Sequence, residues 1–134
     1  MRFNIESTEL EVDIEATAKF YLKQPEIKEN CQCADCRYFQ DKVIRQPINL
    51  FEVLRAMGAD LSRQPNINPD GICCVDDCIG YQKKYMGYYM VVGEILEFKE
   101  PAYTDAESNS ITSWEIKQKD EFLVFDFYIQ YNKI

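Results

Sequence analysis

Histidine is absent from this chain of 134 residues, and its absence excludes several chemistries at once. Imidazole is the usual general base near neutral pH, so neither a Ser–His nor a Cys–His catalytic pair can be assembled. Glycine is scarce as well, with five scattered residues that form neither a phosphate-binding loop nor a nucleophile elbow. The sequence therefore favours a protein that acts by binding over a hydrolase or a kinase.

Basic residues and long apolar runs are also lacking. Lys and Arg number 15 against 23 Asp and Glu, and the net charge of −8 argues against contacts with nucleic-acid phosphates. The longest apolar stretch, residues 88–98, contains Glu94 and Glu97 and is far shorter than the roughly 20 residues that cross a bilayer. Because the first residues also lack a basic and apolar leader, we expect a cytoplasmic protein that binds neither nucleic acid nor membrane.

Hydrophobic residues, by contrast, make up 46% of the chain, and aromatic residues make up 13%. A chain of this length buries about two thirds of the surface of its unfolded form, so it does not need disulfides to fold. We expect a single domain over residues 1–134. Its parts are a helical half at about 13–58, a cysteine-containing loop at about 60–80 and a β half at about 81–131.

The helical half contains three predicted helices. Asp13 is a suitable N-cap for a helix over about residues 13–24, which Pro25 ends. A second helix is expected over about residues 34–45. A third begins near Pro47 and ends at Gly58, with apolar residues at three-residue spacing between them. Turn-forming residues predominate over residues 60–80, so an irregular loop is expected there.

The β half contains segments rich in aromatic and β-branched residues, at 81–85, 88–98, 110–117 and 122–131. Met86-Gly87 and residues 117–120 are typical of hairpin turns, and the polar segment 100–109 is typical of a mobile connection. Consecutive strands without intervening helices indicate an antiparallel sheet. The predicted fold class is α+β, with N-terminal helices packed on one face of a C-terminal antiparallel β-sheet of about four strands.

Six cysteines in two tight clusters are the main chemical feature: Cys31, Cys33 and Cys36 in C-x-C-x-x-C, and Cys73, Cys74 and Cys78 in C-C-x-x-x-C. Structural zinc sites use four ligands, often as two pairs of cysteines spaced by two to four residues. In a reducing compartment, clustered cysteines indicate metal ligands or free thiols more than disulfides. The sequence predicts a zinc site on Cys33, Cys36, Cys74 and Cys78, with Cys31 and Cys73 as alternative ligands.

Two other interpretations of the cysteines remain open. The thiols can be small apolar groups of the core and loops. Alternatively, Cys33 and Cys36 can form a redox dithiol, because the N-terminus of a helix that begins near Ala34 would lower the pKa of a thiol there. Against this, the cluster follows a predicted helix rather than a strand, and the carboxylate of Asp35 opposes thiolate formation.

Acidic residues are concentrated near the N-terminus. Between residues 3 and 18 there is no base, and the acids are Glu6, Glu9, Glu11, Asp13 and Glu15. Such a run most often forms a solvated surface that serves solubility. The alternative interpretation is a docking surface for a basic protein.

Three segments resemble an uncharacterised group of small bacterial cytosolic proteins: DIEATAKFY at residues 13–21, CQCADCRYF at 31–39 and GYYMVVG at 87–93. The resemblance covers roughly residues 12–98, and the cluster of Cys73, Cys74 and Cys78 is outside the shared pattern. The group is associated with immunity proteins of polymorphic toxin systems. The resemblance therefore implies a protein partner, such as a basic toxin domain, and it implies no catalytic residue.

These observations lead to one expectation and two alternatives. We expect a non-catalytic protein-binding protein, most concretely an immunity or inhibitor protein that covers a basic partner such as a nuclease toxin. The alternatives are a cysteine-based redox enzyme or thiol sensor, and a scaffold stabilised by zinc.

Overall fold

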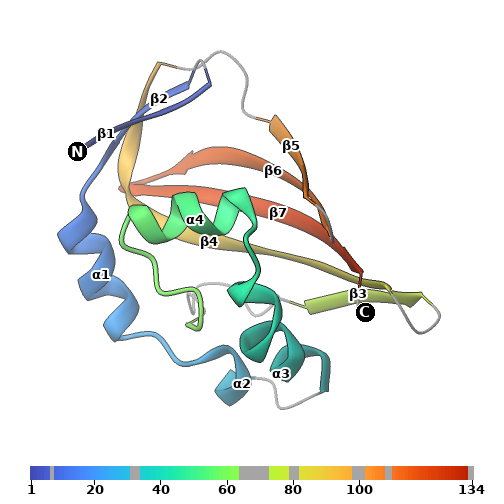
Figure 1. The fold of residues 1–134 in the computed structure, drawn as a ribbon. Coiled ribbons are helices and arrows are strands. Elements are labelled where there is room, and N and C mark those ends of the chain that lie inside the picture. The colour runs from blue at the N-terminus through green and yellow to red at the C-terminus, as the bar shows by residue number, and fades with distance from the viewer. Residues whose placement is uncertain are drawn as a thin grey trace.

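The structure is a computed structural model that describes residues 1–6, 8–30, 34–63, 73–78, 82–97, 102–107 and 110–132. It combines an antiparallel sheet with short helices (Figure 1). The predicted α+β class with an antiparallel sheet is therefore confirmed. None of the described helices is long and apolar enough to cross a membrane.

The chain begins with a hairpin of β1 (Arg2–Ile5) and β2 (Thr8–Val12). The helical elements follow as α1 (Ile14–Leu22), α2 (Ile27–Asn30), α3 (Ala34–Asp41), the 3-10 helix η1 (Val43–Arg45) and α4 (Asn49–Ala56). The other strands are β3 (Cys73–Cys78), β4 (Gln82–Glu97), β5 (Ala102–Glu107), β6 (Ser110–Lys119) and β7 (Phe122–Asn132).

All strand pairings are antiparallel, in the order β1-β2-β4-β7-β6-β5. β3 lies outside this path and pairs with the first part of β4. The central strand β4 therefore pairs with β7 on one side, while β3 and β2 pair with its two ends on the other side.

In the part of the chain that the structure describes, the sheet has seven strands, so the predicted count of about four was wrong. Met86 and Gly87, predicted as a hairpin turn, lie inside the continuous strand β4, where they pair with Tyr128 and Phe127 of β7. The long pairing with β7 outweighs the local turn signal of a single glycine.

Four of the described strands lie where the sequence predicted none. Residues 73–78 form β3 inside the predicted irregular loop, and residues 102–107 form β5 inside the predicted mobile connection. The acidic segment before residue 13 forms the hairpin of β1 and β2. β2 alternates polar and apolar residues and buries Leu10 and Val12, but it is only five residues long. β1, β3 and β5 are also short and contain charged residues. Pairing with a neighbour stabilises each of these strands.

The three predicted helices correspond to α1, to α3 with η1, and to α4, whereas α2 was not predicted. Two of them have a clear local start or stop signal. Asp13 caps α1, with its carboxylate Oδ1 accepting a hydrogen bond of 2.9 Å from the amide of Ala16. The second predicted helix is divided into α3 and η1. Gly58 follows α4 with a φ of +96°, and a Cβ there would lie 2.6 Å from the carbonyl oxygen of Ile14.

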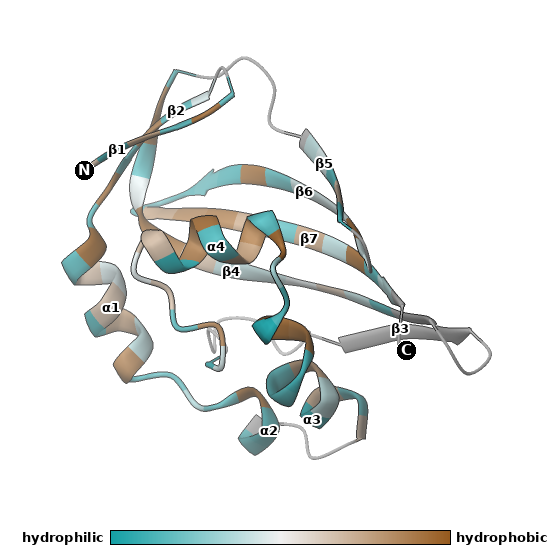
Figure 2. Cartoon of the chain, in the orientation of Figure 1, coloured by the Kyte–Doolittle hydropathy of each residue, from teal (hydrophilic) through white to brown (hydrophobic). Residues whose placement is uncertain are grey.

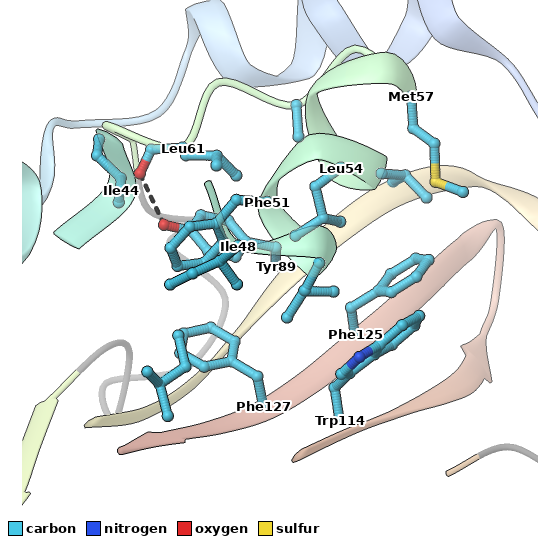
Figure 3. Close-up of a cluster of buried hydrophobic side chains, with 14 of the residues drawn as sticks. Ile44, Ile48, Phe51, Leu54, Met57, Leu61, Tyr89, Trp114, Phe125 and Phe127 are labelled. Atoms are coloured by element: carbon cyan, nitrogen blue, oxygen red, sulfur yellow. Dashed lines mark hydrogen bonds between the residues drawn. The ribbon is translucent and has the colours of Figure 1, made fainter. Parts of the chain in front are cut away.

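The core lies between α4 and the sheet (Figure 3). Phe51 and Leu54 of α4 are fully buried and face Tyr89, Phe125 and Phe127 of the central strands. The ring of Phe51 meets that of Phe127 edge to face at 6.4 Å. In Figure 2, hydrophobic and hydrophilic residues alternate along α4, as expected of a helix with one buried side.

The sheet is curled so far that its two ends are linked. The hydroxyl of Tyr103 in β5 donates to the carbonyl oxygen of Ile5 at 3.1 Å and lies 2.6 Å from the hydroxyl oxygen of Thr8. β5 is also attached to α4, because the carboxylate of Asp105 accepts a hydrogen bond from Nδ2 of Asn49 in that helix. The same carboxylate accepts from Nε1 of Trp114 in the neighbouring strand β6. These links hold the sheet around the core.

Helix α1 covers a gap in the edge of the sheet. Residues 87–92 of β4 pair with β7 on one side, but within the described part of the chain no strand pairs with their other side. The hydroxyl of Tyr21 satisfies both backbone groups of Met90, and that of Thr17 accepts from the amide of Val92 at 2.9 Å. Two helix side chains thus replace the hydrogen bonds of a missing strand.

Candidate functional site

A groove of about 950 Å³ lies where β2, the start of α1, the second half of β4 and the β6–β7 turn meet. Three segments that are distant in the sequence contribute to it, residues 11–14, 92–95 and 118–121, together with Met1. The lining residues are Met1, Glu11, Val12, Asp13, Ile14, Val92, Gly93, Glu94, Ile95, Gln118, Asp120 and Glu121.

Gly93 allows these segments to approach one another. A Cβ at this position would lie 2.3 Å from the carbonyl oxygen of Glu11, a distance that no real contact permits. On the other side of β4, the amide of Gly93 donates to the carbonyl oxygen of Glu121 at 2.9 Å. The glycine therefore joins β2 to the β6–β7 turn, and it sets the width of the groove.

Gln118 fastens the same turn to β4. Its Nε2 donates to the carbonyl oxygens of Gly93, Asp120 and Phe122, at 3.0, 2.9 and 3.1 Å. Its Oε1 accepts from the amide of Ile95 at 2.8 Å. Asp120 in the turn has a φ of +53°, a left-handed conformation that Asp and Asn tolerate better than most residues. These hydrogen bonds fix the backbone of the turn that carries Asp120 and Glu121.

The groove is strongly acidic. The described lining residues include no lysine or arginine, and the cation among them is the ammonium of Met1, 3.0 Å from Glu11. Five carboxylates line the groove: Glu11, Asp13, Glu94, Asp120 and Glu121. Apolar residues also line the groove: Ile14, Val92 and Ile95 are partly exposed, whereas Val12 is only 1% exposed. Carboxylates around an apolar floor fit a ligand that is cationic at its end and aliphatic along its stem, as lysine and arginine side chains are.

The pairing of β2 with β4 adds an unfavourable charge arrangement at this site. Glu9 is directly opposite Glu97, and Glu11 is directly opposite Glu94. Side chains directly opposite each other in an antiparallel pair lie about 5 Å apart, so like charges there repel, although Arg2 and the Met1 ammonium lie beside Glu9 and Glu11. Glu94 is exposed and has no cation within ion-pair distance among the described residues.

The acidic run seen in the sequence does not form one surface. Glu9 and Glu11 pair with Arg2, at 2.8 Å and 3.7 Å, and Glu11 also accepts from the Met1 ammonium at 3.0 Å. Asp13 caps α1, and Glu15 pairs with Lys19 one turn further on at 3.4 Å. Only Glu11 and Asp13 of this run also line the groove.

Sequence reasoning missed Glu94, Asp120 and Glu121 as members of the site. Glu94 did leave a signal, because it interrupts the longest apolar stretch of the chain. Asp120 and Glu121 follow a strand and precede the apolar start of β7, which is a pattern of any hairpin turn. Their meeting with Glu94 depends on the pairing of distant strands, and no local pattern encodes it.

The predicted zinc ligands are only partly within the described structure. Cys36 lies in α3 and is 3% exposed. Cys33, like its alternative Cys31, lies outside the described residues. Cys74 and Cys78, like Cys73, lie in β3, whose side chains are outside the described part. Among the described side chains, no group of three or more Cys, Asp or Glu is arranged to hold a metal ion.

The backbone nevertheless places Cys36 and the cysteines of β3 on neighbouring elements. Some residues of α3 and β3 lie within 8 Å of each other, measured between Cα atoms. The hydroxyl of Tyr85 donates to the carbonyl oxygen of Asp35 at 2.9 Å, and the register pairs Tyr85 with Cys74. Cys36 and Cys74 are thus connected by a short path of contacts although they are far apart in the sequence.

No protein-family model matches this chain, and comparison with curated proteins and with solved structures finds no significant similarity. The function must therefore be argued from the groove and the cysteine-bearing elements themselves.

Proposed function

We propose that the protein is a non-catalytic binding protein that docks a basic partner protein in the acidic groove. The observation that carries this proposal is the opposition of Glu11 and Glu94 across β2 and β4, in a groove where five carboxylates gather. A fold that retains like charges in direct opposition gives up stability at that place. A lysine or arginine of a partner would recover that stability on binding.

The lining also fits the shape of a basic side chain. An aliphatic stem would pack on Val92, which shares a face of β4 with Glu94, while its charged end would meet the carboxylates of Glu94 and Glu121. The negative potential of the groove would accelerate association with a positively charged surface, and this acceleration would weaken as salt is added.

A cytoplasmic immunity or inhibitor protein is the concrete form of this proposal. Nuclease toxins carry positive charge where they hold phosphates, so an acidic groove would cover such a surface by charge complementarity. The absence of histidine and of a nucleophile elbow supports binding over turnover.

A partner can be sought with two matched variants of equal net charge. The groove variant is Glu94→Gln, Asp120→Asn and Glu121→Gln, in which Asn is chosen to keep the left-handed φ at position 120. The control variant neutralises three exposed acids on α2, α3 and α4: Glu29→Gln, Asp41→Asn and Glu52→Gln. Each immobilised chain is incubated with a lysate of the native host, and any captured protein is then purified.

We expect a basic protein to be captured by the wild type and by the control variant, and to bind the groove variant much more weakly. Its association rate should fall at least tenfold between low salt and physiological salt, since steering of this kind is screened. A partner that binds all three chains equally, or with no dependence on salt, would contradict the proposal.

A zinc-stabilised scaffold is the second candidate, favoured by the contact between α3 and β3. We infer that Cys33, Cys36, Cys74 and Cys78 together bind one zinc ion, with Cys31 and Cys73 as alternatives within each cluster. Cys36 is buried next to the sheet, and four thiolates are the donor set of many structural zinc sites. Such an ion would couple folding to metal binding, because the thiols must lose their protons to bind it.

Metal content separates this candidate from the redox alternative. Protein purified under reducing conditions without added metal should contain about one zinc per chain, and Cys36→Ser should remove it. A chelator should lower the melting temperature of the wild type. Metal-free protein with an unchanged melting temperature would contradict the zinc site, and dithiol-dependent turnover lost in Cys33→Ser would favour the redox enzyme.

A further inference from the structure

A second polar cluster lies where the N-terminal end of α4 meets β5 and β6 (Figure 1). It is called the β5 cluster below, and its members are Asn49, Asp105, Glu107, Ser110 and Thr112. Asp105 and Glu107 are two residues apart and therefore share one face of β5. The register places them directly opposite Thr112 and Ser110 of β6. Four oxygen-bearing side chains thus gather on one face of this strand pair.

The two carboxylates of the β5 cluster accept hydrogen bonds from uncharged groups. Asp105 Oδ2 accepts from Asn49 Nδ2 at 3.2 Å and from Trp114 Nε1 at 3.1 Å. Glu107 accepts from the backbone amide of Asn49 at 3.1 Å and from the hydroxyl of Ser110 at 3.2 Å. In the described part of the chain, no lysine or arginine lies within ion-pair distance of either carboxylate. No described cation therefore balances these two charges.

Thr112 adds a buried hydroxyl to the same face. Its side chain is 0% exposed, and its Oγ1 has no hydrogen-bond partner among the described residues. Side chains directly opposite each other in an antiparallel pair lie about 5 Å apart on the same face, so Thr112 is beside Asp105. Buried polar atoms are nearly always satisfied, and an exception indicates a bound water or ion. A buried hydroxyl beside a carboxylate that lacks a counterion points to a bound cation.

The donor atoms of the β5 cluster determine which kind of cation fits. Carboxylate and hydroxyl oxygens are the ligands of hard divalent cations, whereas zinc and copper prefer the sulfur or imidazole ligands that this cluster lacks. Two oxygens that share one cation at about 2.4 Å lie up to about 5 Å apart. This spacing fits Asp105 and Thr112, which are directly opposite each other without a hydrogen bond from the Thr112 hydroxyl.

We propose that the β5 cluster binds a hard divalent cation, Ca²⁺ or Mg²⁺, through Asp105, Glu107, Ser110 and Thr112, with water completing the coordination. The ion neutralises the two carboxylates and gives the Thr112 hydroxyl a partner. Because only two of the protein ligands are charged, binding is weak, with a dissociation constant of about 0.1–1 mM. The site shares no residue with the acidic groove or with the cysteine clusters.

The single tryptophan of the chain reports on this site. Trp114 is hydrogen-bonded to Asp105, so its fluorescence should respond to an ion at the β5 cluster. Protein freed of metal with a chelator is titrated with CaCl₂ and, separately, with MgCl₂. We expect a saturable change with a dissociation constant of about 0.1–1 mM for at least one of the two cations. Tb³⁺, which binds the same oxygen ligands, should emit light sensitised by Trp114, and the cation that binds should displace it.

Substitutions at Thr112 separate cation binding from folding. Thr112→Val removes one ligand and should weaken binding about fivefold or more. Thr112→Ser keeps the hydroxyl and should bind as the wild type does. In metal-free buffer Thr112→Val should melt no lower than the wild type, because it buries no unsatisfied group, so its weaker binding cannot be ascribed to a damaged fold.

Removal of the two charges tests the carboxylates. Asp105→Asn combined with Glu107→Gln keeps oxygens that accept from Asn49, so α4 stays attached, but the cation response should be lost. The control of equal charge is Asp41→Asn combined with Glu52→Gln, two exposed acids on α3 and α4. It should keep the response.

The groove variant should keep the response as well, since the β5 cluster lies outside the groove. The failure of the cation site is therefore distinguishable from the failure of the proposed function.

Three results would overturn the cation site. The first is wild-type protein whose Trp114 emission does not change with either cation up to about 10 mM, well above the expected constants. The second is a response that the Asp105→Asn, Glu107→Gln variant retains. The third is a crystal structure, grown with the cation, in which a water rather than an ion contacts Asp105 and Thr112.

Discussion

The hydroxyl of Tyr21 makes two hydrogen bonds with the backbone of Met90, donating to its carbonyl oxygen at 2.8 Å and accepting from its amide at 3.0 Å. Tyr21 is 1% exposed, and it lies on a helix 69 residues away in the sequence. One side chain thus closes the edge of β4 where neither β2 nor β3 pairs with it. Side chains of α1 therefore complete the hydrogen bonding of this edge of β4.

Tyr21→Phe should lower the free energy of unfolding by about 2 kcal/mol, because it leaves two buried backbone groups without a partner. Amide exchange at Met90 should accelerate in the same variant. The matched control is Tyr128→Phe, since the Tyr128 hydroxyl makes no hydrogen bond with a described residue. A Tyr21→Phe variant as stable as this control would contradict the role of the two hydrogen bonds.

Alkaline pH should destabilise the protein through its buried tyrosines. Burial raises the pKa of Tyr21 and that of Tyr89 well above the ordinary value of 10.0. The unfolded chain therefore releases these protons first, so this contribution to stability is intact below about pH 9 and declines as the pH rises above about 10. Urea unfolding at several pH values should show this decline in the free energy of unfolding. In Tyr89→Phe the free energy should fall less steeply with pH, because one of the buried tyrosine hydroxyls is removed. Stability that does not change up to pH 11 would contradict it.

A substitution at Thr112 should stabilise the protein. Its hydroxyl oxygen is fully buried and has no hydrogen-bond partner among the described residues. Thr112→Val keeps the shape of the side chain and removes the unsatisfied group, so we expect a gain of about 1 kcal/mol in the free energy of unfolding. Thr104→Val on the exposed side of β5 serves as the control and should change little. A loss of stability in Thr112→Val would mean that the hydroxyl is hydrogen-bonded after all.

Because Glu94 lies opposite Glu11, replacing it with an uncharged residue should stabilise the protein. Glu94→Gln should raise the free energy of unfolding by roughly 0.5 kcal/mol at low salt, because it removes the repulsion from Glu11 across the strand pair. The gain should shrink as salt is added, since exposed charges are screened. Glu52→Gln on α4 is the control with the same change in net charge. Equal effects of the two substitutions at low salt would contradict the opposed-pair account.

Helix ends could be predicted from the sequence because they depend on residues near one another. Asp13 and Gly58 marked the start of α1 and the end of α4, and both positions have the backbone geometry that these residues favour. The strands were predicted less well. Met86 and Gly87 have the local composition of a turn, but pairing with Tyr128 and Phe127 keeps them in a strand.

The groove could not be predicted for a related reason. It is formed by residues 11–14, 92–95 and 118–121, which meet only because β4 pairs with β2 and because Gln118 fastens the β6–β7 turn to Gly93. The sequence showed the acidic residues before the first helix, but the structure divides them between ion pairs, a helix cap and the groove. Charge can be counted from the sequence, whereas its location depends on contacts between distant segments.

The central claim, that the acidic groove binds basic groups, is tested most directly by an NMR titration of isotope-labelled protein with an oligolysine peptide. We predict amide shift changes concentrated at Glu11, Gly93, Glu94 and Glu121, and affinity that falls at least threefold in the groove variant but not in the control variant of equal charge. Shift changes spread evenly over the acidic surface, with equal affinities for the two variants, would contradict the claim.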